Sequence, residues 1–225
     1  DDPYDTLMYG TGLGYIAIWR DVTRIAHFKE VSSKRLGQGK ELICVASDAS
    51  MGQDAISRVA IGMRDRIVQV YRLDSAGLLH PIFSVQLDKS VPVALSFCDN
   101  AARDVMVFGL FDGKVVTLRG DNGQVSTTVN IESSIGYISV NRPKNEFAVD
   151  TIFNGIDVHT MDTGVFKKNY ATVHPTFKVS KQVAYAEDAK AIVTGSDTGL
   201  VFVFDRRTAD IVQRLEHGGK AVHAV

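Results

Sequence analysis

Residues 192–205 read IVTGSDTGLVFVFD, and this stretch shows the pattern that decides the fold. An apolar run ends at Gly195, a turn of Ser, Asp, Thr and Gly follows, and a second run alternates apolar residues up to Phe204 and Asp205. Short alternating runs rich in Val, Ile and Phe, separated by Gly and Asp, are typical of strands joined by tight turns. The stretch therefore predicts two neighbouring strands with a tight turn between them.

The same shape occurs five times along the chain. In each copy a turn with Gly or Asp precedes alternating apolar residues, a bulky residue and a polar one; the copies are 14–20, 66–72, 113–119, 157–162 and 199–205. The bulky residue falls at positions 19, 71, 118, 161 and 204, at spacings of 52, 47, 43 and 43 residues. Repeats of ~40–45 residues with several strands each are typical of propeller blades, whereas runs with a period of two do not fit a helical repeat.

Across essentially its whole length the chain resembles the WD40-repeat family. Phe204-Asp205 stands in place of the family's Trp-Asp pair, and Met161-Asp162-Thr163-Gly164 matches the same pair with its following turn. His217 stands where a Gly-His dipeptide opens the next blade, although Glu216 replaces the glycine. Only Trp19 keeps the tryptophan, so the copies are degenerate. The resemblance implies an all-β, WD40-like propeller of about five four-stranded blades; a solenoid or a lipocalin-like barrel is the alternative.

We expect a single domain over residues 1–225, since one domain typically spans ~100–200 residues and all-β domains often run longer. The blade units fall at about 1–35, 36–90, 91–132, 133–172 and 173–216. The first unit starts at Thr6–Tyr9 without its innermost strand, while Ala221–Val225 reads as an isolated innermost strand. Either that strand completes the first blade of a five-bladed ring, or the chain is part of a seven-bladed ring. The usual blade number of the family favours the second interpretation.

The composition is that of an ordinary globular protein, with 45% hydrophobic and 23% charged residues. The net charge is −1, so the chain lacks the basic excess of a DNA-coating protein. No apolar run reaches the ~18–20 residues of a membrane helix, and no signal peptide is visible. Cys44 and Cys98 lie in apolar runs, which indicates free thiols in a reducing compartment. We therefore expect an intracellular protein, cytoplasmic or nuclear.

No catalytic or cofactor motif is visible in the sequence. None of the six histidines forms a metal-ligand spacing, and no Gly-x-Ser-x-Gly elbow is present. The glycines of residues 10–14 precede a strand, so they offer no helix N-terminus to a phosphate. We expect no enzyme activity, no cofactor and no metal, although catalytic groups that converge from separate blades would leave no such motif.

The turns between the second and third strands of the blades, here called the b–c turns, carry the first candidate site. Its members are Arg64, Phe111, Phe153 and Asp197. Turn residues are normally polar, and aromatic and Arg side chains are enriched in interface hot spots, each costing ~2 kcal/mol or more on truncation. The family resemblance implies that this rim binds proteins. The alternative is that both phenylalanines pack into the mouth of the ring.

A second candidate is a basic rim at the opposite end of the strands. Arg20, Arg72 and Arg119 follow the bulky residue where the family prefers Asp, and Arg206 and Arg207 would share that rim. Such a stripe could bind phosphate, RNA or an acidic protein surface. The alternative, solvated or locally paired arginines, is favoured by the near-zero net charge. A sugar site at Asp121-Asn122-Gly123 is a third possibility, against a plain hairpin turn.

The resemblance also implies residues with structural roles. In the family an Asp of the b–c turn bonds a His, a Ser and a Trp of its blade; Asp65 and Asp112 occupy that place, but no blade holds the full set. The other residues expected to be structural are Trp19, Asp162, Asp205 and His217. The favoured function is a non-enzymatic scaffold for protein–protein interaction. Binding of nucleic acid or acidic surfaces is the second hypothesis, and carbohydrate binding the third.

Overall fold

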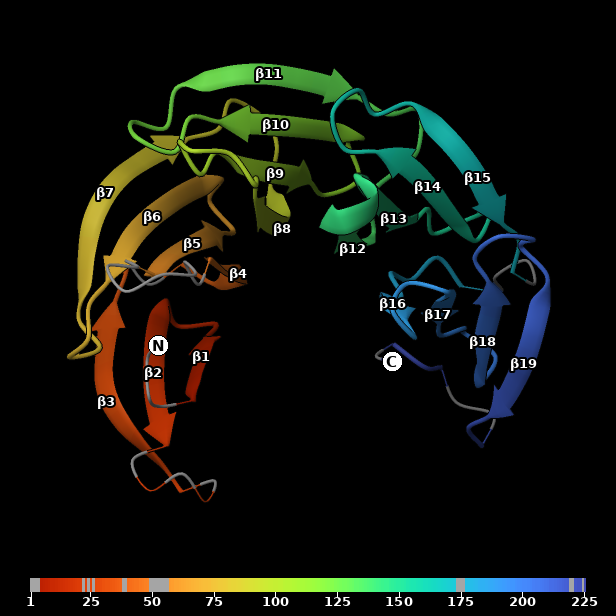
Figure 1. The fold of residues 1–225 in the computed structure, drawn as a ribbon, viewed down its shortest axis with the longest axis horizontal. Coiled ribbons are helices and arrows are strands. Elements are labelled where there is room, and N and C mark those ends of the chain that lie inside the picture. Colours follow the sequence, from red (N-terminus) through yellow and green to blue (C-terminus); the bar gives the residue numbers. More distant parts are fainter. Residues whose placement is uncertain are drawn as a thin grey trace. The chain divides into compact units, whose positions relative to one another are not determined.

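Antiparallel strands make up nearly all the regular structure of the computed structural model, which describes residues 5–21, 23, 25, 27–37, 40–48, 57–172, 177–218, 221–223 and 225. Five sheets follow one another along the chain (Figure 1). The strands of the first three sheets are β1 (Thr6–Gly10), β2 (Tyr15–Asp21), β3 (Phe28–Arg35), β4 (Leu42–Asp48), β5 (Ser57–Met63), β6 (Ile67–Leu73), β7 (Leu79–Gln86), β8 (Pro92–Phe97), β9 (Val105–Gly109), β10 (Lys114–Leu118) and β11 (Val125–Asn130). Those of the last two are β12 (Tyr137–Asn141), β13 (Glu146–Asp150), β14 (Ile156–Thr160), β15 (Phe166–Tyr170), β16 (Val183–Ala186), β17 (Ala191–Thr194), β18 (Leu200–Asp205) and β19 (Ile211–Glu216).

Each sheet is a meander in which strands pair in sequence order, and we call each sheet a blade. Blade one has three strands, β1-β2-β3, and the other blades have four. A 3₁₀ turn, η1 (Arg142–Lys144), joins β12 to β13. This is the predicted all-β, WD40-like propeller of about five blades, and the first blade lacks its innermost strand as predicted.

Two details of the predicted strands need correction. The sequence pattern did not indicate β3, because Phe28–Arg35 alternates weakly and is mostly exposed. The strand predicted over Ala221–Val225 does not form in residues 221–223. Instead Val222 N donates to Ser196 O and Gln182 N donates to His223 O, so this segment lies along blade five.

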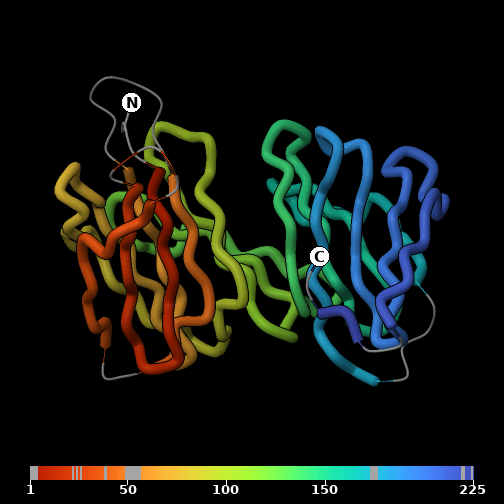
Figure 2. Tube along the Cα trace, turned by 90° about the horizontal axis from the view of Figure 1, so that it is seen from below, coloured from red at the N-terminus to blue at the C-terminus, as the bar shows by residue number. Residues whose placement is uncertain are grey.

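The chain divides into two compact units, which are described separately. Unit 1 comprises Asp1–Val107 and Val116–Thr127, and unit 2 comprises Phe108–Val115 and Thr128–Val225. Figure 2 colours unit 1 from red to green and unit 2 from green to blue. Blades one and two lie in unit 1, blades four and five in unit 2, and blade three contributes residues to both.

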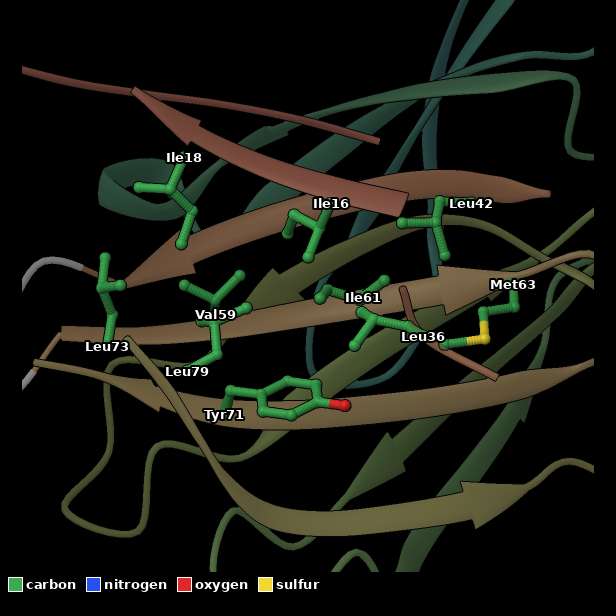
Figure 3. Packing of buried hydrophobic residues seen from close by; sticks show 10 residues of the cluster. All are labelled: Ile16, Ile18, Leu36, Leu42, Val59, Ile61, Met63, Tyr71, Leu73 and Leu79. Atoms are coloured by element: carbon green, nitrogen blue, oxygen red, sulfur yellow. The ribbon is translucent and has the colours of Figure 1, made fainter. Parts of the chain in front are cut away.

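The cores lie between neighbouring blades. In unit 1, Ile16 and Ile18 of β2 pack against Val59 and Ile61 of β5, with Tyr71 beside them (Figure 3). In unit 2, buried residues of blades four and five form the corresponding core. The second strands β9 and β13 are buried at every position, whereas the outer strands β11 and β19 are largely exposed. Strands buried on both faces read as continuous apolar runs, and half-exposed ones alternate.

The b–c turns repeat one backbone device in every blade. The last turn residue has a left-handed φ of 82°, 70°, 67°, 92° or 85° at Gly14, Arg66, Gly113, Gly155 and Gly199 respectively. In four blades its carbonyl accepts an N–H from just beyond the outer strand; the donors are Leu36, Leu87, Ile131 and His217, at 2.7–2.9 Å. These bonds fix the b–c turns to the rest of their blades.

The bulky residue of the fourth copy is His159, not Met161 as the spacing predicted. A β-bulge lies directly before Trp19, Tyr71 and Phe204, and in blade four the same bulge lies between Val158 and His159. His159 is 2% exposed, and its ring stacks on Phe147 at 5.5 Å. The sequence misled because Met161-Asp162 imitates the Trp-Asp pair, whereas Met161 lies in the turn after β14.

Candidate functional site

Three exposed phenylalanines of unit 2 form what we call the aromatic cluster. Phe111 lies in the b–c turn of blade three and is 57% exposed, and Phe153 lies in that of blade four and is 43% exposed. Phe177 precedes blade five and is 66% exposed. Exposed aromatic side chains are enriched in interface hot spots. Phe177 was not predicted, because its only signal in the sequence is a single aromatic residue in the link between two blades.

Phe111 is held in an unusual backbone conformation. Its φ is +64°, in the left-handed region that bulky residues rarely adopt. Its N–H donates to Ile135 O at 3.0 Å, which fixes the residue on the loop that leads into blade four. Because the conformation costs energy while the ring is left exposed, Phe111 has the combination that functional turns often show.

Phe153, Phe177 and Asp197 are linked through local contacts. Lys178 Nζ lies 4.9 Å from the centroid of the Phe153 ring, within cation–π distance. The Phe177 N–H donates to Asp197 Oδ2 at 2.9 Å. The structure thus joins Phe153 and Asp197 through the segment Phe177–Lys178, and Asp197 acts on that segment by positioning its backbone.

Arg64, the fourth predicted member, lies in unit 1. It occupies the b–c turn of blade two, and its guanidinium pairs with Glu41 at 2.8 Å. Both side chains are about half exposed. An exposed pair of this kind contributes ~0–1 kcal/mol to stability, so Arg64 remains accessible to a partner.

The predicted basic rim separates into internal and exposed residues. Arg20 is buried, and its Nη2 donates to Asp74 O at 3.0 Å while its Nη1 donates to Ser75 O. Both acceptors lie in the turn between the third and fourth strands of blade two, here called the c–d turn. Arg20 therefore joins blade one to blade two. Arg206 pairs with Glu146 at 2.8 Å. The exposed members are Arg72, Arg119 and Arg207.

Arg206 and Arg207 line a hollow of about 310 Å³ in unit 2, here called the unit 2 hollow. Glu146 lies in it with a side chain only 3% exposed, and its carboxylate binds Lys167 at 3.3 Å as well as Arg206. Tyr170 OH donates to Arg206 O at 2.6 Å, and burial raises the pKa of Tyr170 to about 12. Lys168 Nζ donates to Arg207 O.

The residues expected to be structural lie in turns and strands. Asp112 Oδ1 accepts Lys114 N at 3.0 Å within its own b–c turn, and Asp65 occupies the equivalent turn of blade two. Asp205 Oδ1 accepts two backbone N–H groups of its c–d turn, both at 2.8 Å. Trp19 pairs with Leu7 and Glu30 within its sheet.

Asp162 and His217 show contacts that differ from the family pattern. Asp162 accepts Asn145 Nδ2 at 2.6 Å, and the c–d turn of blade four is instead closed by Thr160 Oγ1, which accepts Val165 N at 3.0 Å. His217 is exposed, and its backbone N–H provides the bond to Gly199 O.

The acceptor that the family places after its tryptophan is present in blades one and two, but further along the chain. Asp21 Oδ1 accepts Thr23 N at 2.9 Å, and Asp74 Oδ1 accepts Ala76 N and Leu78 N at 3.0 and 2.8 Å. Asp74 Oδ2 also contacts His80 at 2.7 Å. Arg20 and Arg72 therefore did not replace the turn acceptor; the acceptor moved by one or two positions.

Other features bear on the remaining hypotheses. Asn122 Oδ1 accepts Gln124 N at 2.9 Å, and Gly123 has φ +75°, as in an ordinary hairpin turn. Within the part of the chain that the structure describes, no group of three His, Cys, Asp or Glu side chains could hold a metal, and no helix is long and apolar enough to cross a membrane. Among the described residues, neither Cys44 nor Cys98 forms a disulfide, and burial raises the pKa of Cys44 to about 12.

No protein-family model matches the chain, and no curated protein matches its sequence. The structure is similar to the crystal structure of Saccharomyces cerevisiae Sqt1, a WD40 protein, with a TM-score of 0.74 and 10% identity over 96% of this chain and 60% of Sqt1. It is also similar to the computationally designed Ika8 protein, with a TM-score of 0.65 and 18% identity over 97% of this chain and 61% of Ika8. The chain thus spans about 60% of the length of both, and the likeness defines a WD40-like β-propeller fold.

Proposed function

We propose that this chain is a non-enzymatic scaffold that binds a protein partner through its b–c turns. The WD40-like fold supports this, because such a fold presents turns on rigid blades, although a fold alone does not fix a function. The observation that carries the proposal is Phe111, an exposed aromatic side chain on a left-handed backbone in a b–c turn. The free thiol of Cys44 supports an intracellular location.

The mechanism is rigid presentation. The b–c turn of blade three is fixed by the bond from Ile131 N to Gly113 O and by that from Phe111 N to Ile135 O. Side chains held by such turns lose little freedom on binding, which lowers the entropic cost of association. The aromatic cluster supplies the apolar anchors of unit 2, and Asp197 supplies a polar group bonded to the backbone of Phe177. Arg64 supplies a polar group on the b–c turn of blade two in unit 1.

The test is a double substitution in the aromatic cluster. We expect Phe111→Ala with Phe153→Ala to abolish retention of the partner in affinity purification from the native cell, because each exposed aromatic anchor contributes ~2 kcal/mol or more. The matched control is Phe166→Ala, which removes an exposed phenylalanine from the outer strand of blade four. Circular dichroism should be unchanged in both variants. Full retention by the folded double variant would contradict the proposal.

A second candidate is binding of nucleic acid or an acidic surface through the exposed arginines. Arg72, Arg119 and Arg207 are the members of the basic rim that favour it. Retention on heparin or RNA that weakens steeply with salt would support this function, since phosphate contacts release counterions. Absence of retention at low salt would exclude it.

A further inference from the structure

A hollow of about 500 Å³ lies in unit 1 on the side of blade two, and we call it the unit 1 hollow. Its charged and apolar lining comes from Arg58, Arg72, His80, Pro81, Ile82 and Arg103. The volume falls within the ~300–1,000 Å³ typical of ligand pockets. The hollow differs from the b–c turns, and Arg72 is its only member that belongs to the predicted basic rim.

Three guanidinium groups converge on the unit 1 hollow. Arg58 of β5 and Arg72 of β6 are directly opposite in the strand register, and like charges in that position destabilise a sheet. Arg103 enters from the first turn of blade three, with a left-handed φ of +52°. Burial, and after it the charge of Arg103, lower the pKa of Arg58. The strand pairing thus holds the like charges of Arg58 and Arg72 next to each other.

In the part of the chain that the structure describes, the lining of the unit 1 hollow holds three arginines and no carboxylate. Asp48 contacts Arg103 at 3.4 Å, and Asp48 and Asp121 both act on Arg58 from a distance. The Asp74 carboxylate contacts His80 Nε2 at 2.7 Å. Arg58 itself donates to the carbonyls of Ala102 and Gly120 at 3.1 and 2.8 Å. Among the described residues, Arg72 makes no ion pair with a carboxylate, so its charge stays available.

In the unit 2 hollow, a carboxylate occupies the strand position that Arg58 occupies in blade two. Glu146 is opposite Thr160 as Arg58 is opposite Arg72, and in each blade one residue separates the bulge from Thr160 or Arg72. Glu146 is therefore the equivalent of Arg58, and its carboxylate binds Lys167 and Arg206. Blade four therefore has the carboxylate of Glu146 at the position where blade two has the guanidinium of Arg58.

We propose that the unit 1 hollow binds the phosphate dianion of a phosphomonoester. Guanidinium groups bind phosphate oxygens through paired, charge-assisted hydrogen bonds. Arg72 would contribute its free donors, and Arg103 its charge. Pro81 and Ile82 provide an apolar wall for the organic part of the ligand. The bound phosphate supplies a negative charge to the cations of blade two, as Glu146 does to Lys167 and Arg206 in unit 2.

The experiment titrates the full chain with inorganic phosphate and with phenyl phosphate at pH 7.5, where a phosphomonoester, with its second pKa near ~6, is mostly dianionic. Binding is followed by calorimetry and ³¹P NMR at constant ionic strength, because phosphate raises the thermal midpoint of most proteins without a site. We expect saturable binding, tighter for phenyl phosphate. Saturation by inorganic phosphate with equal affinity would identify free phosphate as the ligand and overturn the monoester assignment.

The decisive variant is Arg72→Glu, with Lys89→Gln as the control, which removes an exposed cation elsewhere in unit 1. The new carboxylate faces Arg58, so the thermal midpoint without phosphate should not fall. Phosphate binding should weaken by at least about tenfold, the effect of one charged hydrogen bond, while Lys89→Gln binds as the wild type does.

Three further outcomes would overturn the proposal. One is an absence of phosphate binding by the wild type, and another is equal binding by Arg72→Glu and Lys89→Gln. The third is tight binding of oligouridine without binding of phenyl phosphate, which would assign the arginines to RNA. Arg72→Gln provides a milder second variant if Arg72→Glu fails to fold.

Discussion

Gly155 shows how strongly a single position of the b–c turn is constrained. Its φ is +92°, and a Cβ there would lie 2.2 Å from Tyr170 O and 2.8 Å from Thr172 N. A left-handed conformation costs an L-residue ~1–2 kcal/mol before any clash. We expect Gly155→Ala to lower the free energy of unfolding by more than about 2 kcal/mol, measured by chemical denaturation.

Gly12 provides the matched control in the b–c turn of blade one. Nothing lies within 4 Å of a Cβ added there, and its φ is not left-handed. Gly12→Ala should change stability by less than ~0.5 kcal/mol, as surface substitutions usually do. Similar losses for the two variants would show that turn glycines in general, rather than the left-handed position, determine stability.

Single residues were the hardest to assign from sequence. The turn glycines were visible, because a glycine before an alternating run indicates a tight turn. The burial of Arg20 could not be predicted. Its guanidinium donates to a backbone carbonyl of the next blade, and no sequence pattern indicates such a bond. His159 was missed because blade four has one residue fewer between its turn and its bulge than blade two.

At the scale of the element, the c–d turns couple stability to pH. Asp205 Oδ1 accepts N–H groups from Thr208 and Arg207, and these bonds, that from Thr208 first, lower the pKa of Asp205 below its ordinary value of 3.8. Because the folded chain favours the ionised form, the stabilisation is complete above pH 3.8 and is lost as the pH falls through the lowered pKa.

Asp205→Ala should therefore have a lower thermal midpoint than the wild type at neutral pH, and the difference should shrink as the pH falls below 3.8. The control is Asp210→Ala, which removes an exposed carboxylate just beyond the same turn. The measurement is thermal unfolding followed by circular dichroism between pH 7 and pH 2. A difference that stays constant with pH would mean that Asp205 acts through packing.

Strands were more predictable than sites. The centres of β9 and β13, VMVF and FAV, are visible as short apolar runs, because second strands are buried on both faces. The outer strand β3 was not predicted, since its sequence FKEVSSKR carries no such run. The aromatic cluster was partly visible as apolar residues in turns. The unit 1 hollow was not, because its arginines come from different strands and turns.

At the scale of the whole molecule, side chains that reach the turns of a neighbouring blade tie blade one to blade two, blade two to blade three, and blade four to blade five. Within unit 1, Arg20 of blade one donates to Asp74 O of blade two, and Arg58 of blade two donates to Gly120 O of blade three. Within unit 2, Tyr170 of blade four donates to Arg206 O of blade five. Repeat proteins stabilised by contacts between nearest neighbours lose stability locally when one contact is removed.

Arg20→Gln tests whether stability is local in this chain. Loss of charge-assisted bonds from a buried guanidinium should cost about 2 kcal/mol. If contacts act between neighbours, amide hydrogen exchange followed by mass spectrometry should accelerate in blades one and two and stay unchanged in blades four and five. Arg119→Gln, at an exposed arginine of blade three, should leave exchange unchanged throughout. Equal acceleration in all blades would instead mean that the chain unfolds as one cooperative body.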